Sequence, residues 1–469
     1  ILNVAGWTLK ERSYGALHRV SIGKFCTCRS ASFFGNHHTK GSAMKALRTH
    51  VAGVDVHKDM LAITVMIGKG DEDPRLEHFE CSTMTDDLRA MGIVLKGKGV
   101  CDVAMESTGV YWKPVYNVWA PLGLNPIIGN ASHMKNVPGR KTDQKDAEWI
   151  ARLHRFGLIR PSFVPDGIYQ RLRLLSRHRT NLTEDHARVK NRVQKVLEDG
   201  NIKWSSIVSD TFGVAGIKIL DLIADGVTNA QTLSNSVTTK IKRKEDAKKA
   251  LTNCLTAEHI FVIKELMIQY RDLESRILEV DNELVEKMKP FAHLIEELKK
   301  IPGIDRVLAM GLLAEATADM SSFADERRFA AWAGVAPGNN ESAGKKKRSR
   351  CRKGNPALRK ILIQAAHGAK MKRGSFYRAK YNKLVYRLGS KNKAKVAIAN
   401  RLARTIYKVL GGSPFKDIGY MRGDPHEEKV KRLVAQLKSL GVNISHQNHQ
   451  MIVSSTRKVT VDDTGIVLQ

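Results

Sequence analysis

Short apolar segments between residues 51 and 129 constrain the fold of this chain more than any other feature. Five of them have the length and residue types of strands: 51–56, 61–67, 75–81, 100–105 and 125–129. Helical patterns at 86–95 and 112–122 separate the later ones. Strands followed by alternating helices and strands predict an α/β sandwich for the front of the chain.

The middle of the chain has a helical period. Apolar residues recur at steps of three, four and seven from Ile168 to Leu197, and a heptad pattern runs from Ile263 to Leu284 and ends before Pro290. The segment 200–255 between them is less regular. Two arrangements remain open, a helical hairpin within one chain and a coiled coil between chains.

Positive charge concentrates in the last third. The chain has 78 Lys plus Arg against 47 Asp plus Glu, a formal net charge of +31. Ser342 to Lys416 contains 23 of the basic residues and no acid. A polyanionic partner explains this excess, because each phosphate that is neutralised releases counterions. The competing polyanion, a membrane surface, would require a basic amphipathic helix or a lipidation motif, and neither is evident, so we expect no membrane partner.

Four carboxylates form the first candidate site. Asp55 lies inside an apolar strand, where a charge is costly unless it is paired or binds a metal. Glu106 follows the fourth strand, and Asp143 and Asp146 are three residues apart, on one face of a following helix. Asp143 or Asp146 alone could be a helix cap or a surface acid, and Glu106 alone could be a turn residue, whereas Asp55 is more telling by itself. Together the four suit two divalent cations and in-line phosphoryl transfer.

A Gly- and Asn-rich loop carries the second candidate site. Ser342 lies in this loop and could attack a phosphodiester, with nearby cations stabilising the negative charge that develops. A loop serine is more often a turn or phosphate-contact residue. The basic residues that we expect to bind nucleic acid are Lys345, Lys346, Lys347, Arg348, Arg350, Arg352, Lys353 and Arg359.

Two helix boundaries flank this loop. A Pro-Gly turn at 301–304 separates two helical segments and resembles a helix-hairpin-helix, whose backbone N–H groups can hold a phosphate. After the loop, Asn355 is a natural N-cap followed by Pro356 at the first helical position. We expect the apolar stripe of that helix to face the core. The aromatic residues 376, 377, 381 and 386 suit base stacking or a core position equally well.

Residues 1–43 have no regular apolar period and precede the first methionine, Met44. They could be an upstream translation, a targeting presequence or a genuine extension. We favour the first, because the strand pattern begins directly after Met44.

Several motifs in order give the chain a family resemblance. They are GVDVHKD (53–59), AMESTGVYWKPV (104–115), KTDQKDAEWIARL (141–153), IPGI (301–304), FAAWAGVAPGNNESAGKKKR (329–348) and KGNPALRK (353–360). With these, the chain resembles the insertion-sequence one-ten type transposases, relatives of the pilin-gene DNA invertase that act as bridge-RNA-guided recombinases.

The resemblance implies a RuvC-like domain with an RNase H fold at 44–165, whose DEDD tetrad is Asp55, Glu106, Asp143 and Asp146 and binds Mg²⁺ (or Mn²⁺). It implies a mostly α-helical transposase domain at 297–415 with Ser342 as the nucleophile. The stretch 166–296 is then a helical, coiled-coil linker, and 416–469 is a tail. Implied partners are donor and target DNA, a structured guide RNA and further copies of the chain in a dimer or tetramer.

We therefore predict a DNA transposase, or site-specific recombinase, that is cytoplasmic and nucleoid-associated in a prokaryotic cell. It would cut and rejoin DNA through a 5′-phosphoserine at Ser342. One alternative is a Holliday-junction endonuclease that uses the tetrad for two-metal hydrolysis. Another is a non-catalytic nucleic-acid-binding protein.

Overall fold

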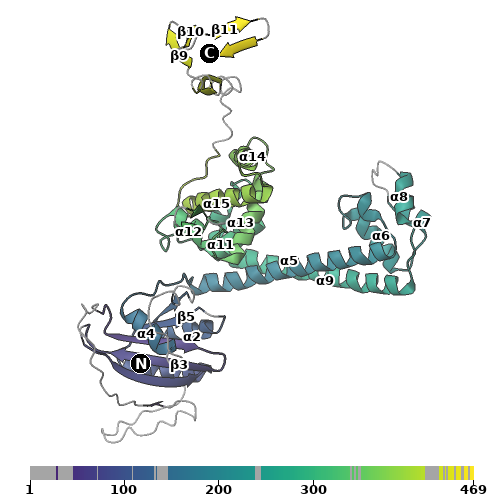
Figure 1. Cartoon of the computed structure of the whole chain (residues 1–469). Helices are drawn as coiled ribbons and strands as arrows, with labels where there is room; N and C mark the ends of the chain where they lie inside the picture. Colours follow the sequence, from purple (N-terminus) through teal and green to yellow (C-terminus); the bar gives the residue numbers. More distant parts are fainter. Residues whose placement is uncertain are drawn as a thin grey trace. The chain divides into compact units, whose positions relative to one another are not determined.

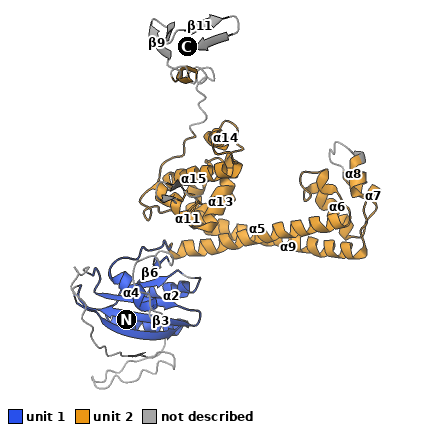
Figure 2. Cartoon of the chain, viewed as in Figure 1, with its two compact units in different colours: residues 1–164 blue, residues 165–469 orange. Residues whose placement is uncertain are grey.

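A computed structural model gives the structure of this chain (Figure 1). The residues that it describes are 28–29, 46–70, 72–107, 109–130, 134, 146–237, 244–338, 341–342, 345–346, 350–417, 433–436, 439, 442–447, 450–455, 459–462 and 465–468. The chain divides into two compact units, residues 1–164 and 165–469 (Figure 2).

Unit 1 is built on a mixed sheet of six strands in the order β1-β4-β3-β2-β5-β6. The strands are β1 (Cys28–Arg29), β2 (His50–Val56), β3 (Met60–Ile67), β4 (Arg75–Ser82), β5 (Asp102–Glu106) and β6 (Asn125–Gly129). The β2–β3 and β3–β4 pairs are antiparallel, whereas β2–β5 and β5–β6 are parallel. The five predicted strands are all present, and this mixed sheet is consistent with the expected RNase H-like fold.

Helices cover both faces of this sheet. On one face, α1 (Thr85–Gly97) and α2 (Trp112–Trp119) bury Leu88 and Trp119 against the strands. The Nε1–H of Trp119 donates to the main-chain O of Leu88 at 2.8 Å, so this large ring is buried with its polar atom satisfied. On the other face, α4 (Asp146–Arg155) packs Ile150 and Leu153 against Ala104 of β5. Each such buried aliphatic side chain contributes about 1.5–3 kcal/mol.

Unit 2 contains two long helices that pack side by side within the chain, α5 (Gly167–Asp199) and α9 (Ala257–Lys287) (Figure 1). The two predicted helical segments thus form a hairpin, with an ion pair between Arg179 and Asp281. A coiled coil between chains stays a prediction.

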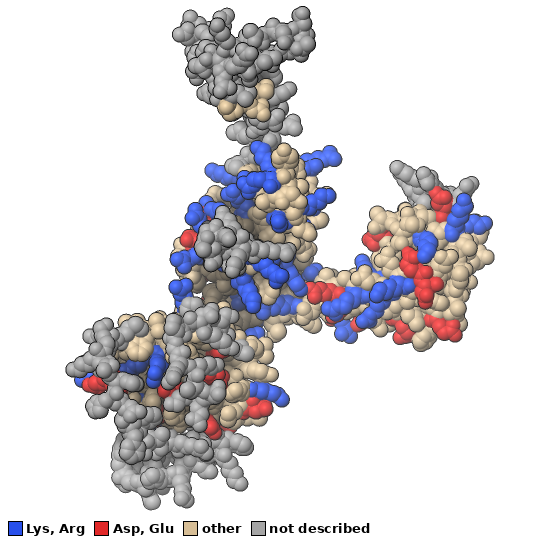
Figure 3. Space-filling model, viewed as in Figure 1, with Lys and Arg blue, Asp and Glu red and all other residues tan. Residues whose placement is uncertain are grey.

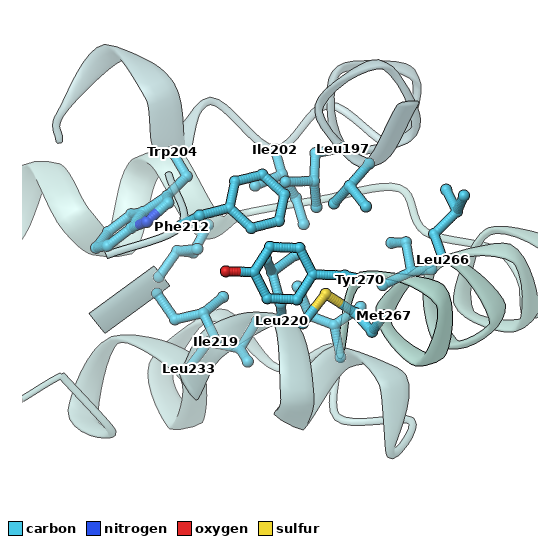
Figure 4. Close-up of a cluster of buried hydrophobic side chains, with 14 of the residues drawn as sticks. Leu197, Ile202, Trp204, Phe212, Ile219, Leu220, Leu233, Leu266, Met267 and Tyr270 are labelled. Atoms are coloured by element: carbon cyan, nitrogen blue, oxygen red, sulfur yellow. The ribbon is translucent and has the colours of Figure 1, made fainter. Parts of the chain in front are cut away.

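A small helical module joins α5 to α9. It contains η1 (Trp204–Ser206), α6 (Val214–Ala224), α7 (Ala230–Asn235) and α8 (Lys244–Leu251). Its core packs Trp204, Phe212 and Leu220 against Leu197 of α5 and Tyr270 of α9 (Figure 4). The module therefore shares its core with the ends of both long helices.

The rest of unit 2 is mainly helical. Its elements are η2 (Lys289–Phe291), α10 (Ala292–Lys299), α11 (Arg306–Ala316), α12 (Glu326–Trp332), α13 (Pro356–Ala369), α14 (Phe376–Leu388) and α15 (Lys391–Leu410), with the two-residue strands β7 (Glu341–Ser342) and β8 (Lys345–Lys346) between α12 and α13. Four more strands follow as two antiparallel pairs, β9 (Val442–Gln447) with β10 (Gln450–Ser455) and β11 (Val459–Asp462) with β12 (Gly465–Leu468). In the described part of the chain, no helix is both long and apolar enough to span a bilayer.

Candidate active site

The face of the sheet under α4 is shaped by Gly53 of β2. An ideal Cβ at this position would lie 2.2 Å from the main-chain O of Ala147 and 2.2 Å from the N of Ala151. Only glycine permits such a close approach, so the first turns of α4 lie directly against the backbone of β2. The side chains that point to this face of the strand are therefore near the N-terminus of α4.

Asp55 is one of these side chains, because it is two residues beyond Gly53 on the same strand. Its side chain is 27 % exposed, and its Oδ2 lies 3.1 Å from Nε2 of His57. His57 was not among the predicted site residues. The available signal was its place two residues after Asp55, at the point where β2 ends.

Glu106 is the last residue of β5, the parallel neighbour of β2. Gly53 is in register with Ala104, so Ala104 and Glu106 share the face that carries Gly53 and Asp55. The pairing of Val54 with Met105 then places Glu106 beside Asp55, where both parallel strands reach their carboxyl ends. Both residues are partly exposed there.

Asp146 is the first residue of α4 and is half-buried. It precedes Ala147, which touches Gly53, so it lies on the same side of the sheet as Asp55 and Glu106. A carboxylate in the first turn is also favourable for the helix dipole, so this position alone does not make it a ligand. The fourth predicted carboxylate, Asp143, lies outside the described residues.

These carboxylates supply the hard oxygen donors that Mg²⁺ or Mn²⁺ prefers. Within the ranges that the structure describes, no three His, Cys, Asp or Glu side chains lie close enough together to hold a metal ion. The structure places Asp55, Glu106 and Asp146 on one face of the sheet but does not gather them into a metal-binding group. Their donor chemistry suits a divalent cation, and a metal site at this face stays a prediction.

Ser342 lies in a hairpin of unit 2. It belongs to β7, and its register partner in β8 is Lys345. A short stem leads into this hairpin, in which the N–H of Gly338 donates to the O of Arg350 at 2.9 Å and the N–H of Arg352 donates to the O of Ala336 at 3.1 Å.

Backbone contacts join the two sides of this stem at its base. The N–H of Asn355 donates to the O of Trp332 at 2.8 Å. Gly334 has φ +72°, and an ideal Cβ on Gly354 would lie 2.3 Å from the O of Trp332. Glycine is therefore required on both sides of the base, which holds the two ends of the Ser342 segment together.

Two family profiles match the chain on either side of its central module. A profile described as a transposase matches residues 52–202, and one described as the transposase IS116/IS110/IS902 family matches residues 295–382. Together they cover just over half of the 469 residues. The chain belongs to the IS110 family of transposases.

Individual relatives agree with this assignment. The putative transposase y4pF/y4sB of Sinorhizobium fredii is 33 % identical over 147 residues, which cover 30 % of this chain and 37 % of that protein. An uncharacterised 44.8 kDa protein of the insertion element IS116 from Streptomyces clavuligerus is 24 % identical over 326 residues, 63 % of this chain and 79 % of that protein. A probable family 20 transposase of Pseudomonas aeruginosa is 27 % identical over 155 residues, 32 % of this chain and 44 % of that protein. The match therefore spans less than half of the first and third relatives.

Around the Ser342 hairpin of this IS110-family chain, the predicted basic residues differ in their surroundings. Arg350, Arg352 and Lys353 are exposed. Arg359 is half-buried, and its Nη1–H donates to the O of Gly334 at 3.1 Å, so it also supports the base of the stem. Lys345 and Lys346 form β8, whereas Lys347 and Arg348 lie outside the described residues.

Lys and Arg side chains gather over the α11–α15 part of unit 2 (Figure 3). The exposed ones on α14, α15 and the turn before them include Lys372, Arg373, Lys383, Arg387, Lys391, Lys393 and Arg401. Among the aromatic residues, Tyr377 has the predicted core position, and base stacking by the exposed ones stays a prediction. Tyr377 is buried, with its O–H bonded to Thr405 at 3.0 Å, whereas the side chain of Tyr386 is 94 % exposed.

The Pro-Gly turn between α10 and α11 is packed against α13. Ile301 and Ile304 are buried, and Gly303 has φ +84°. An ideal Cβ on Gly303 would lie 2.3 Å from the O of Ala365 and 2.3 Å from the N of Ala369. The IPGI motif is thus explained by close packing between helices, and a phosphate-binding role for it stays a prediction.

At the C-terminal end of α4, His154 is 1 % exposed. Burial, and secondarily the nearby Arg48, lowers the pKa of His154 from 6.5 to about 4, against the opposing effect of Asp102. Nε2 of His154 has no hydrogen-bond partner among the described residues. The imidazole is therefore neutral at physiological pH, and it anchors the helix that begins at Asp146.

Proposed function

We propose that this chain is a DNA transposase in which the carboxylates Asp55, Glu106, Asp143 and Asp146 and the hydroxyl of Ser342 carry out strand cleavage and rejoining. The observation that carries the proposal is the position of Asp55 and Glu106 at the ends of adjacent parallel strands, on the face that Asp146 approaches at the start of α4. The family membership adds DNA as the substrate class.

The proposed reaction is a transesterification. The Oγ of Ser342 attacks a backbone phosphorus, the O–P bond forms, and the bond from phosphorus to the 3′ oxygen breaks. The serine loses its proton and the leaving 3′ oxygen gains one, so the products are a 5′-phosphoserine and a free 3′-hydroxyl. Attack by another 3′-hydroxyl then rejoins the strand and regenerates the serine.

The carboxylates would hold Mg²⁺ or Mn²⁺, which when bound stabilises negative charge on the attacking and leaving oxygens. Asp55 is oriented for this by strand β2 and by its contact with His57 at 3.1 Å. Glu106 is oriented by the β5–β6 ladder, in which it is in register with Gly129. The strand ladders fix the backbone of both residues, and the His57 contact also restrains the carboxylate of Asp55.

The exposed Arg350, Arg352 and Lys353 lie on the strand of the stem that returns from the Ser342 hairpin, where they would contact the DNA backbone and neutralise phosphate charge.

The proposal also includes a structured guide RNA, assembly into a dimer or tetramer, and domain limits at 44–165, 166–296, 297–415 and 416–469. These rest on the family resemblance of the motifs.

The decisive test compares Ser342→Ala with Asp55→Ala. Each purified variant is incubated with the RNA that co-purifies with it, Mg²⁺ and labelled duplexes taken from the genomic flanks of the gene, and covalent DNA adducts are resolved on a denaturing gel. We expect the unaltered chain to form an adduct that maps to Ser342, and we expect both variants to lose strand exchange. Ser321→Ala, at an exposed serine after α11, is the matched control and should behave as the unaltered chain.

The outcomes separate the alternatives. Cleavage that persists in Ser342→Ala without an adduct would indicate a hydrolytic endonuclease of the Holliday-junction type. Full activity in Asp55→Ala would overturn the carboxylate site. Recovery of only random cellular RNA with the chain would count against a guide.

A further inference from the structure

A carboxylate is buried where α5, α11 and the Ser342 segment meet. Glu315 is the penultimate residue of α11, and its side chain is 1 % exposed. Arg177 of α5 donates to it from Nε at 2.7 Å and from Nη2 at 2.9 Å. The charge-assisted hydrogen bonds to Glu315 raise the pKa of Arg177 further above its ordinary value, so Arg177 stays protonated.

A second arginine surrounds the same group. Arg173 lies with Nε 3.5 Å from Oε2 of Glu315, and the same Nε–H donates to the O of Ala314 at 3.2 Å. Its guanidinium lies over the ring of Trp332, with 6.0 Å between the guanidinium carbon and the ring centroid. The guanidinium groups of Arg173 and Arg177 therefore hold the Glu315 carboxylate in one place. Arg173 also connects it to Trp332, whose main-chain O accepts the hydrogen bond at the base of the stem.

The third partner is Asn355, which ends the Ser342 segment. Its Nδ2–H donates to Oε2 of Glu315 at 2.6 Å. Its Oδ1 accepts from the N–H groups of Ala357 and Leu358 at 3.0 and 3.1 Å, which caps α13. Only the Nδ2–H group of the Asn355 amide can donate to the carboxylate of Glu315. Glu315 therefore fixes the amide with Nδ2 towards itself and Oδ1 towards the N-terminus of α13.

Asn355 also closes the base of the stem through its own backbone. Its N–H donates to the O of Trp332, so one residue connects the buried carboxylate, the cap of α13 and the start of the segment that carries Ser342. A buried ion pair seldom adds stability over well-packed apolar residues, because desolvation offsets the attraction. What the charged network adds is a single, defined geometry for the base.

We propose that Glu315 and Asn355 are positioning residues for the Ser342 hairpin: the carboxylate fixes the Asn355 amide, and the amide fixes the base from which the hairpin extends. The inference rests on the proposed function of Ser342. Neither residue is required to touch DNA. The network holds the two ends of the Ser342 segment in one arrangement. Ser342 then meets the phosphodiester in one orientation.

The contact can be tested by exchanging its donor and acceptor. Asn355→Asp keeps the helix cap, because Asp caps as well as Asn, but places a second carboxylate against Glu315. Glu315→Gln removes the acceptor charge. The double variant restores a hydrogen bond of reversed polarity, with the new amide donating to the new carboxylate, although one of the two Arg177 contacts is lost.

Three quantities are measured on the full chain: the single-turnover rate of adduct formation on the duplex that reacts with the unaltered chain, the Kd for that duplex, and amide hydrogen exchange. We expect each single variant to form the adduct about tenfold more slowly with an unchanged Kd. The double variant should recover to within about threefold. Exchange at Gly338 and Arg352 should accelerate in the single variants and slow again in the double variant, while exchange in α15 stays constant.

Other results would overturn the inference. Single variants that form the adduct at the ordinary rate, or a double variant that recovers its melting temperature without its rate, would show that the network is only structural. Asn355→Ser keeps the cap and removes the donor without adding charge, so it replaces Asn355→Asp if that variant does not fold. If the unaltered chain forms no adduct, the proposed nucleophile fails, but the exchange data still decide whether Glu315 orders the base.

Discussion

Neutral His154 makes unit 1 sensitive to mild acid, in a direction and amount that the structure defines. Its pKa is lowered from 6.5 to about 4 by burial, and the unfolded chain takes up the proton near 6.5. A lowered folded-state pKa gives stability that is complete above 6.5 and is lost as pH falls towards 4. The full loss is about 3 kcal/mol, of which roughly 2 kcal/mol falls between pH 7 and pH 5.

The measurement is urea unfolding of the full chain at pH 7 and pH 5, followed by hydrogen exchange of the sheet amides of unit 1. His154→Leu removes the titrating group while keeping an apolar side chain of similar volume. We expect the difference in unfolding free energy between the two pH values to be smaller by roughly 2 kcal/mol in this variant. His50→Leu, which changes a half-buried histidine at the start of β2, is the control.

An equal pH dependence in the unaltered chain and in His154→Leu would refute this reasoning. It would mean that the imidazole is protonated within the folded unit, or that α4 opens locally without cost. A stronger pH dependence of the unfolding free energy in His154→Leu than in the unaltered chain would also refute it.

Three further predictions concern other parts of the chain. Gly53→Val places a Cβ within 2.2 Å of the backbone of Ala147, so α4 must move and unit 1 should lose about 1–3 kcal/mol or more; an unchanged melting temperature would contradict the close contact. Ile223→Ala, at a fully buried site in the central module, should cost about 2–5 kcal/mol and accelerate hydrogen exchange in that module, with no change in the sheet of unit 1. Arg352→Gln and Lys353→Gln should each weaken DNA binding and reduce the slope of log K against log salt by about 1. A salt dependence that neither change alters would exclude both side chains from phosphate contact.

The strands of unit 1 could be predicted because helices bury both faces of the sheet. Runs such as 61–67 are then continuously apolar and β-branched, and the structure places β3 at Met60–Ile67. The short partner strand β1 gave no signal, since two residues carry no periodicity. The stretch 200–255, predicted as a less regular part of a helical linker, gave no regular period because its core combines residues from several short helices.

Part of the candidate site could also be predicted from the strand pattern. Strand alternation and parallel register place Asp55 and Glu106 together once the strands are known. The contact of Asp55 with His57 depends on the turn after β2, and the approach of α4 depends on Gly53, so both needed the structure. The Glu315 network joins residues 138 and 40 positions apart, and no local pattern indicates such pairs.

The central module leaves and rejoins the long helices at neighbouring points. The N–H of Cys254 donates to the O of Gly200 at 2.9 Å, and an ideal Cβ on Gly200 would lie 2.3 Å from a methyl carbon of Leu255. The stretch between the two family matches, residues 203–294, contains this module and α9. A module whose ends meet in this way can change in length at its outer loops without altering the spacing of α5 and α9, provided that the core it shares with them is kept. The same adjacency makes the outer loops of the module the natural positions at which a foreign segment could be inserted into the chain.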